Sequence, residues 1–242
     1  MIEHRIDITT PDGVMPAFEF YPSEGGPHPV VFYLMDAPSI RPALRDMASR
    51  LASAGYYVLL PFLYYRGSPY REFGTSDEDM HLRRDLMQSV TREGMLRDAR
   101  GMLAHASQNE NARVDGPKGA VGLCMSGPLV LALAQAMPED FPAVASIHGA
   151  WLVTDDEDSP HRCVDQIQGE VYFGWAEDDP LATPDDLKVI KRALEQAGVR
   201  HTIDYFEGAV HGFAPPGSER YHRHASETQW ARVHALLRRR LG

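Results

Sequence analysis

Short apolar runs alternate with helical patterns along most of the chain. Residues 29–35 read PVVFYLM, a continuous apolar run typical of a strand that is buried on both faces of a parallel sheet. Further strands are predicted at residues 56–60, 119–123, 143–147, 169–173 and 201–206. The predicted helices cover residues 42–54, 79–108, 128–137, 184–197 and 219–240, the second with a break near Gly94. Repeated strand–helix units with short connections predict an α/β fold with a doubly wound, mostly parallel sheet.

The first 21 residues follow a different pattern. Residues 3–9 and 14–21 alternate between apolar and polar positions and flank the turn Pro11-Asp12-Gly13, which predicts an antiparallel hairpin. Residues 62–77 are polar and aromatic with little periodicity and are expected to form a loop. No insertion between strands is long enough for a large cap, so we expect one domain over residues 1–242 with an open pocket for a small substrate.

Polar side chains follow most of the predicted parallel strands. They are Asp36, Cys124, His148, the acids at residues 177–179, and His211. Because ligands of such sheets bind outside the carboxyl ends of the strands, one edge of the sheet is expected to gather a thiol, two imidazoles and several carboxylates. This edge is the predicted functional site.

Cys124 lies between a predicted strand and a predicted helix in the frame G-x-C-x-S-G. A nucleophile elbow needs small residues two positions before and after the nucleophile, and Gly122 and Ser126 occupy those positions. The start of a helix and a nearby imidazole both favour the thiolate form of a cysteine. The backbone N–H groups of Met125 and Ala37 are the expected donors of an oxyanion hole.

A buried, inert cysteine is the alternative for Cys124, and it is the commoner role of a single cysteine. The elbow frame favours the nucleophile. Cys163 lies in a polar segment without such a frame, and no role is predicted for it.

His211 is the expected general base. It lies in the glycine-flanked segment GAVHGF just after the last predicted strand. Glu177, Asp178 and Asp179 follow the preceding strand, and one of them is expected to orient the imidazole, because adjacent loop side chains diverge. A solvated loop histidine and an acidic helix start are ordinary alternatives when each is considered alone. The order nucleophile, acid, histidine favours the catalytic interpretation.

Three segments resemble the dienelactone hydrolase family, whose members have a cysteine nucleophile and the α/β-hydrolase fold: GLCMSG at 122–127, GWAEDDP at 174–180 and HGF at 211–213. The resemblance covers nearly the whole chain. It implies Cys124 as nucleophile, His211 as base, and Asp179 rather than Asp178 as the third member of the triad.

The resemblance also implies roles near the triad, and the sequence departs from the family at several of these positions. Asp36 is similar to a family glutamate that is thought to hold the resting thiol protonated, although an aspartate reaches less far. Phe62 follows Pro61 where the family usually has aspartate. Pro215 stands where enzymes acting on dienelactone carry an arginine that binds the substrate carboxylate. The fold and the triad are therefore carried over, and the dienelactone substrate is not.

Aromatic and basic side chains are candidates for binding the substrate. The aromatic side chains of the predicted site suit a small, partly apolar acyl or ring substrate. They are Tyr64, Tyr65, Trp151 and Phe213. Arg66, Arg83 and Arg84 are the candidates to supply a cation for the substrate. The predicted substrate-binding residues are Tyr64, Arg66, Arg83, His148, Trp151 and Phe213.

Composition narrows the possible partners and location. The chain has 24 Lys and Arg against 34 Asp and Glu, a net charge of −10, which disfavours binding to nucleic acid or to an anionic membrane. Two cysteines suggest a reducing compartment, and residues 30–35, the longest apolar run, are too few to span a bilayer. Glu3, Arg5 and Asp7 lie where a signal peptide would have its apolar core, so no signal peptide is predicted. We expect a cytoplasmic monomer or small homo-oligomer without a cofactor.

The sequence suggests three candidate functions. The leading hypothesis is a hydrolase of small carboxylic esters or lactones that works through an acyl-cysteine. The alternative is a member of the same fold that binds a small ligand without catalysis. A metal site built from several of the 11 histidines, such as His222-x-His224, is disfavoured, because residues i and i+2 of a helix face apart and no CxxC or HExxH spacing is present.

Overall fold

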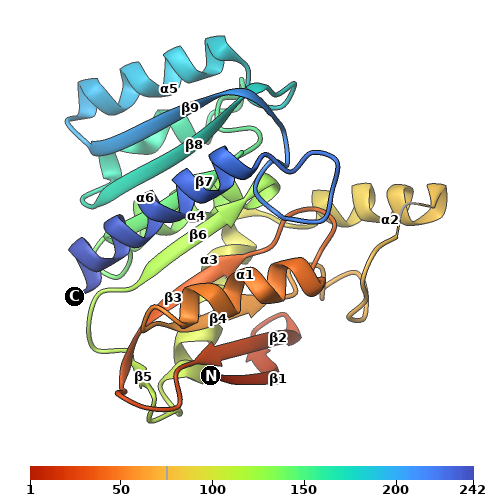
Figure 1. Ribbon diagram of the computed structural model, residues 1–242, viewed down its shortest axis with the longest axis vertical. Helices are drawn as coiled ribbons and strands as arrows, with labels where there is room; N and C mark the ends of the chain where they lie inside the picture. Colours follow the sequence, from red (N-terminus) through yellow and green to blue (C-terminus); the bar gives the residue numbers. More distant parts are fainter. Residues whose placement is uncertain (75) are drawn as a thin grey trace. The chain divides into compact units, whose positions relative to one another are not determined.

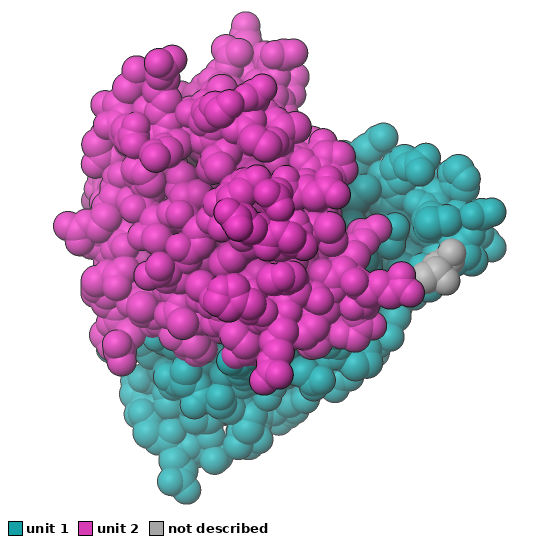
Figure 2. Space-filling view, turned by 45° about the horizontal axis from the view of Figure 1, so that its top comes forward, with its two compact units in different colours: residues 1–116 teal, residues 117–242 magenta. Residues whose placement is uncertain are grey.

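The computed structural model describes residues 1–74 and 76–242. The chain forms two compact units, residues 1–116 and residues 117–242 (Figure 2). Each unit combines strands of a sheet with the helices that pack on them. The expectation of one domain over the whole chain stays a prediction. The predicted loop at residues 62–77 includes Thr75, which lies outside the described residues.

The first unit begins with the predicted antiparallel hairpin. Strands β1 (Ile2–Thr10) and β2 (Gly13–Tyr21) pair along their whole length, from Ile2 opposite Tyr21 to Thr10 opposite Gly13. Strand β2 then pairs antiparallel with β4 (Tyr57–Pro61). The antiparallel start of the sheet is therefore confirmed.

The rest of the first unit consists of parallel strands and the helices that connect them. Strand β3 (His28–Leu34) is buried at every position, as its continuous apolar run predicts, and it pairs parallel with β4 and with the short β5 (Ala112–Arg113). Helix α1 (Pro42–Ala52) packs on β2 and β4.

The long helix predicted at residues 79–108 is two helices, α2 (Asp77–Gln88) and α3 (Arg92–Ala106). The predicted break is present, but it lies at residues 89–91 and not at Gly94. Thr91 caps α3 by accepting the N–H of Gly94, which places Gly94 inside the first turn of that helix. Helix α3 packs on β1.

The second unit contains four parallel strands in consecutive order, β6, β7, β8 and β9 (Figure 1). Their bounds are Gly119–Leu123, Ala143–Ile147, Glu170–Asp178 and Arg200–Val210. Because these strands are parallel and paired in register, their carboxyl ends meet at one edge. Cys124 follows β6 at that edge, His148 follows β7, Asp179 follows β8 and His211 follows β9.

Helices connect and cover these strands. Helix α4 (Gly127–Ala136) packs on β6 and β7, and α6 (Arg223–Leu241) packs on all four strands. Helix α5 (Pro184–Ala197) has the predicted bounds. Thr183 and Asp186 form a capping box at its start, and Gly198 ends it with a left-handed backbone. Two 3-10 segments, η1 (Cys124–Ser126) and η2 (Pro160–Gln166), complete the unit.

Among residues 1–74 and 76–242, no helix has the length and apolar character that crossing a membrane requires.

Candidate active site

Cys124 lies on a sharp turn between β6 and α4. Its backbone has a φ of +53°, a left-handed conformation that is uncommon for a residue with a side chain and is often found at functional sites. A Cβ atom at Gly122 would collide with the carbonyl group of Ser126, so the turn can form only with glycine there. The turn places the Cys124 side chain at the carboxyl edge of the strands, and the residue is 8% exposed.

His211 connects Cys124 to Asp179. Its Nε2 lies 3.0 Å from Sγ of Cys124, and its Nδ1 lies 2.7 Å from Oδ2 of Asp179. The other oxygen of Asp179 accepts the N–H of Leu181 at 2.9 Å. The Asp179 side chain is only 1% exposed, whereas that of His211 is 13% exposed. A thiol, an imidazole and a buried carboxylate therefore form one continuous hydrogen-bonded chain.

The three neighbouring acids after the strand have separate contacts. The exposed Glu177 accepts the backbone N–H of Gly208 at 2.8 Å, and the backbone carbonyl of Asp178 accepts the N–H of His211 at 3.2 Å. The pairing of β8 with β9 is irregular between Ala176 and Asp178. Asp179 is the acid whose side chain reaches the imidazole.

The surroundings of His211 favour its protonated form. Burial lowers the pKa of His211, but hydrogen bonds and charge interactions with Asp179 and Cys124 raise that pKa by more, so the net shift is upward. An imidazole with a raised pKa can accept the thiol proton and retain it. The geometry and the charge distribution thus suit transfer of a proton from sulfur to nitrogen.

Three predicted substrate-binding residues belong to the same unit as the triad. His148 is buried, and its ring lies edge-to-face with the His211 ring at a centroid distance of 5.2 Å. Phe213 is fully buried, and its ring lies edge-to-face with the His148 ring at a centroid distance of 5.3 Å. Trp151 is 42% exposed and has a positive φ. Met125, a predicted oxyanion donor, directly follows Cys124 and is buried.

The remaining predicted site residues belong to the first unit. Asp36 is buried and forms a two-point ion pair with Arg41, with N–O distances of 2.5 and 2.8 Å. Sequence analysis did not identify Arg41, although it lies only five residues after Asp36. Tyr64 is fully buried, and its hydroxyl donates to the carbonyl of Ala37 at 3.0 Å. The thiol-modulating role of Asp36 and the oxyanion role of Ala37 stay predictions.

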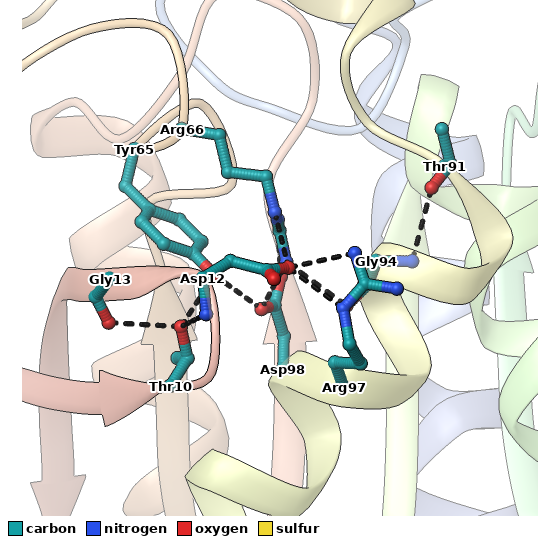
Figure 3. Close-up of polar contacts among 9 residues, drawn as sticks. All are labelled: Thr10, Asp12, Gly13, Tyr65, Arg66, Thr91, Gly94, Arg97 and Asp98. Carbon is teal, nitrogen blue, oxygen red and sulfur yellow. Dashed lines mark hydrogen bonds and ion pairs between the residues drawn. The ribbon is translucent and has the colours of Figure 1, made fainter.

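Arg66 is engaged in a charge cluster of the first unit (Figure 3). All three guanidinium nitrogens donate hydrogen bonds, to the carboxylates of Asp12 and Asp98 and to the carbonyl of Gly94. The guanidinium also lies over the ring of Tyr65, 4.5 Å from its centroid. We therefore do not carry Arg66 into the proposed substrate site. Arg83, on α2, is half-buried.

The described part of the chain contains no group of three or more His, Cys, Asp or Glu side chains that could hold a metal ion. His222, from the histidine pair considered above, caps the start of α6 by accepting the N–H of Ala225 at 3.2 Å.

Comparisons with known proteins agree with this organisation. The sequence model of the dienelactone hydrolase family matches residues 15–241. A carboxymethylenebutenolidase of Rhodococcus opacus is 25% identical over 223 residues, which cover 90% of this chain and 84% of that protein. A candidate carboxymethylenebutenolidase of Synechocystis sp. is 28% identical over 219 residues, which cover 89% of this chain and 88% of that protein.

Solved structures share the fold over the whole chain. A candidate dienelactone hydrolase from Klebsiella pneumoniae superposes with a TM-score of 0.86 at 21% identity and covers 98% of both chains. A dienelactone hydrolase-like promiscuous phosphotriesterase from metagenomic libraries superposes with a TM-score of 0.80 at 20% identity, covering 100% of this chain and 99% of that one. These superpositions confirm the predicted α/β-hydrolase fold. Since the family model spans nearly all of the chain, this protein belongs to the dienelactone hydrolase family, and it is a hydrolase of that kind.

Proposed function

We propose that this protein hydrolyses small carboxylic esters or lactones through a Cys124–His211–Asp179 triad and an acyl-cysteine intermediate. The observation that carries the proposal is the position of the His211 ring, which contacts the Cys124 sulfur with one nitrogen and the buried Asp179 carboxylate with the other. A nucleophile, its base and the group that orients the base are the parts that acyl transfer requires.

The first half of the reaction acylates the sulfur. His211 Nε2 takes the thiol proton, and the thiolate attacks the carbonyl carbon of the substrate, forming the C–S bond. The backbone N–H of Met125 stabilises the oxyanion of the tetrahedral intermediate. When the intermediate collapses, the C–O bond to the leaving alkoxide breaks and the His211 imidazolium returns its proton to that oxygen. In a lactone the leaving hydroxyl stays attached to the acyl group.

The second half releases the acid. His211 removes a proton from a water molecule as the water attacks the thioester carbonyl. The C–S bond then breaks, and the imidazolium proton returns to the sulfur. Asp179 keeps the imidazole in the tautomer that presents Nε2 to the sulfur and offsets the charge of the imidazolium in both halves.

The substrate we propose is neutral at the position where dienelactone carries its carboxylate. Pro215 cannot supply a cation, and the Arg66 guanidinium already binds two carboxylates. Binding a substrate carboxylate through Arg66 would leave the buried Asp98 without its counter-ion, which is costly in a poorly solvated environment. These two features favour neutral esters and lactones.

The test measures hydrolysis by the wild type, Cys124→Ala and Cys163→Ala. The substrates are a short-chain nitrophenyl ester, a neutral lactone and a dienelactone that carries a carboxylate. We expect loss of activity only in Cys124→Ala, with unchanged folding by circular dichroism, and a higher kcat/KM for the neutral substrates. Equal turnover in Cys124→Ala would overturn the triad, and a preference for the carboxylate substrate would overturn the specificity. No turnover by any protein, with Cys124 inert to iodoacetamide, would favour the non-catalytic ligand-binding alternative.

A further inference from the structure

The turn formed by residues 148–151 contacts all three segments that carry the triad. The N–H of Ala150 donates to the carbonyl of Cys124 at 3.0 Å. The N–H of Trp151 donates to the carbonyl of Leu181 at 3.0 Å, in the loop that Asp179 begins. The ring of His148 lies against the ring of His211. One short segment thus connects to the nucleophile, the acid and the base.

This turn holds an unusual backbone conformation. Both His148 and Trp151 have a positive φ, at +38° and +54°. Such conformations cost free energy in residues with side chains and persist where the surrounding contacts determine them. The N–H of His148 donates to the carbonyl of Gly174 on β8 at 2.8 Å, which anchors the start of the turn to the neighbouring strand.

Close packing fixes the turn against the helix that follows Cys124. A Cβ atom at Gly149 would collide with the hydroxyl of Ser146 and would lie 3.3 Å from the Cα of Gly127, at the start of α4. The turn therefore has little freedom to shift relative to the nucleophile.

The turn contacts the Cys124 and Asp179 segments through backbone hydrogen bonds, whereas it contacts His211 through the packing of two side-chain rings. The ring planes meet at 71°, so one imidazole presents its edge to the face of the other. Phe213 supports His148 at 5.3 Å and 76°, and Phe206 supports Phe213 at 5.2 Å. The hydrogen bonds at Nδ1 and Nε2 restrain rotation of the His211 ring, whereas packing against the ring restrains its displacement.

We propose that His148 is a positioning residue that holds the His211 ring between Asp179 and Cys124 by packing against it, and that it does not bind the substrate. The proposal rests on the proposed function, because it assigns His148 to the triad that performs that function. It replaces the substrate-binding role predicted for His148 from the sequence.

Two substitutions separate packing by the ring from chemistry of its nitrogens. His148→Asn removes the ring but keeps a residue that tolerates a positive φ, so the turn is retained. His148→Phe keeps a ring without a titratable nitrogen. Phe206→Leu is the control for general loosening of the same aromatic cluster, since the described contact of Phe206 is with Phe213.

The first measurement is the rate at which iodoacetamide alkylates Cys124, followed against pH by peptide mapping so that Cys163 is counted separately. It needs no substrate, so it tests His148 even if ester hydrolysis fails. The second is kcat and KM on the best ester. For His148→Asn we expect kcat to fall about 10- to 100-fold with KM within about twofold of wild type, and the alkylation profile against pH to shift. We expect His148→Phe to retain both properties within about threefold, and Phe206→Leu to lower only Tm.

A His148→Asn variant with wild-type kcat and a wild-type alkylation profile would overturn the proposal. A folded His148→Phe variant as impaired as His148→Asn would also overturn it, because the ring nitrogens and not the packing would then be required. A rise in KM alone would return His148 to substrate binding. If Cys124 of the wild type is alkylated normally but the protein hydrolyses none of the substrates, the proposed function is rejected. The alkylation profiles of the variants would still decide the role of His148.

Discussion

Nδ1 of His211 lies 2.7 Å from Oδ2 of Asp179, and that carboxylate is almost completely excluded from solvent. A buried carboxylate in this position selects one tautomer of the imidazole and stabilises its protonated form. The pKa of His211 is raised as a result, against the opposing effect of burial. The charge state of His211 is therefore linked to a single acidic side chain, and this link can be tested by changing that side chain alone.

Asp179→Asn is expected to lower kcat by about 10²- to 10⁴-fold, because the amide can hold the wrong tautomer. It should also move the alkaline limb of the kcat/KM profile to lower pH. The sign follows from the shift: Asp179 raises the pKa of His211, so removing its charge lowers that pKa and the imidazolium loses its proton earlier. The measurement is a pH–rate profile. Asp178→Asn, which changes an exposed neighbour, is the matched control, and a larger effect there would contradict the assignment of Asp179.

Gly122→Ala is expected to abolish both activity and selective alkylation of Cys124 and to lower Tm. The added Cβ would overlap the carbonyl of Ser126 and crowd Val130, so the turn that presents the sulfur cannot form. Gly116→Ala serves as the control, because a Cβ there lies 3.4 Å from Arg113. Thermal unfolding and iodoacetamide labelling would check both variants. Retention of a normally reactive Cys124 in Gly122→Ala would show that the elbow does not require glycine.

Arg66→Met is expected to destabilise the protein by about 3 kcal/mol, because it leaves the carboxylate of Asp98 buried without a counter-ion. Arg71→Met removes the more exposed ion pair with Asp79 and should cost less than about 1 kcal/mol. Urea unfolding gives both values. If Arg66 instead bound the substrate, its substitution would raise KM strongly in protein of nearly normal stability.

Glu19 is expected to make stability sensitive to acid. Burial raises its pKa, but hydrogen bonds with His105, Tyr57 and His4 lower it by more, to about 2. Because this folded-state pKa lies below the ordinary glutamate value of 4.5, the stability gained from ionised Glu19 is complete above about pH 4.5 and is lost as the pH falls towards about 2. Unfolding free energy measured against pH should show this loss.

Glu19→Gln should reduce the slope of stability between pH 4.5 and 2 and should itself lower stability at neutral pH. The exposed Glu24→Gln should leave both unchanged. An equal slope in wild type and Glu19→Gln would contradict the cause given for the lowered pKa.

Local sequence determined most of the elements of this protein. The strand at Ala143–Ile147 and the helix at Pro184–Ala197 have the predicted bounds, because an apolar run and a capping sequence act over a few residues. The motif around Cys124 likewise predicted its turn, since only glycine fits at Gly122. The break before α3 was misplaced, because the weak helix preference of Gly94 suggested a break at that residue. The hydrogen bond that caps the helix at Thr91 instead starts α3 before Gly94.

Tertiary structure decided which side chains meet. Among three consecutive acids, the irregular pairing of β8 with β9 and the bound N–H of Leu181 bring the side chain of Asp179 to His211. Arg66 is held by Asp12 and Asp98, which are 54 and 32 residues away in the chain. A sequence pattern records spacing along one element, whereas these contacts depend on where separate elements pack. The chemistry available at the strand ends was therefore predictable from sequence, and the choice of partners required the folded chain.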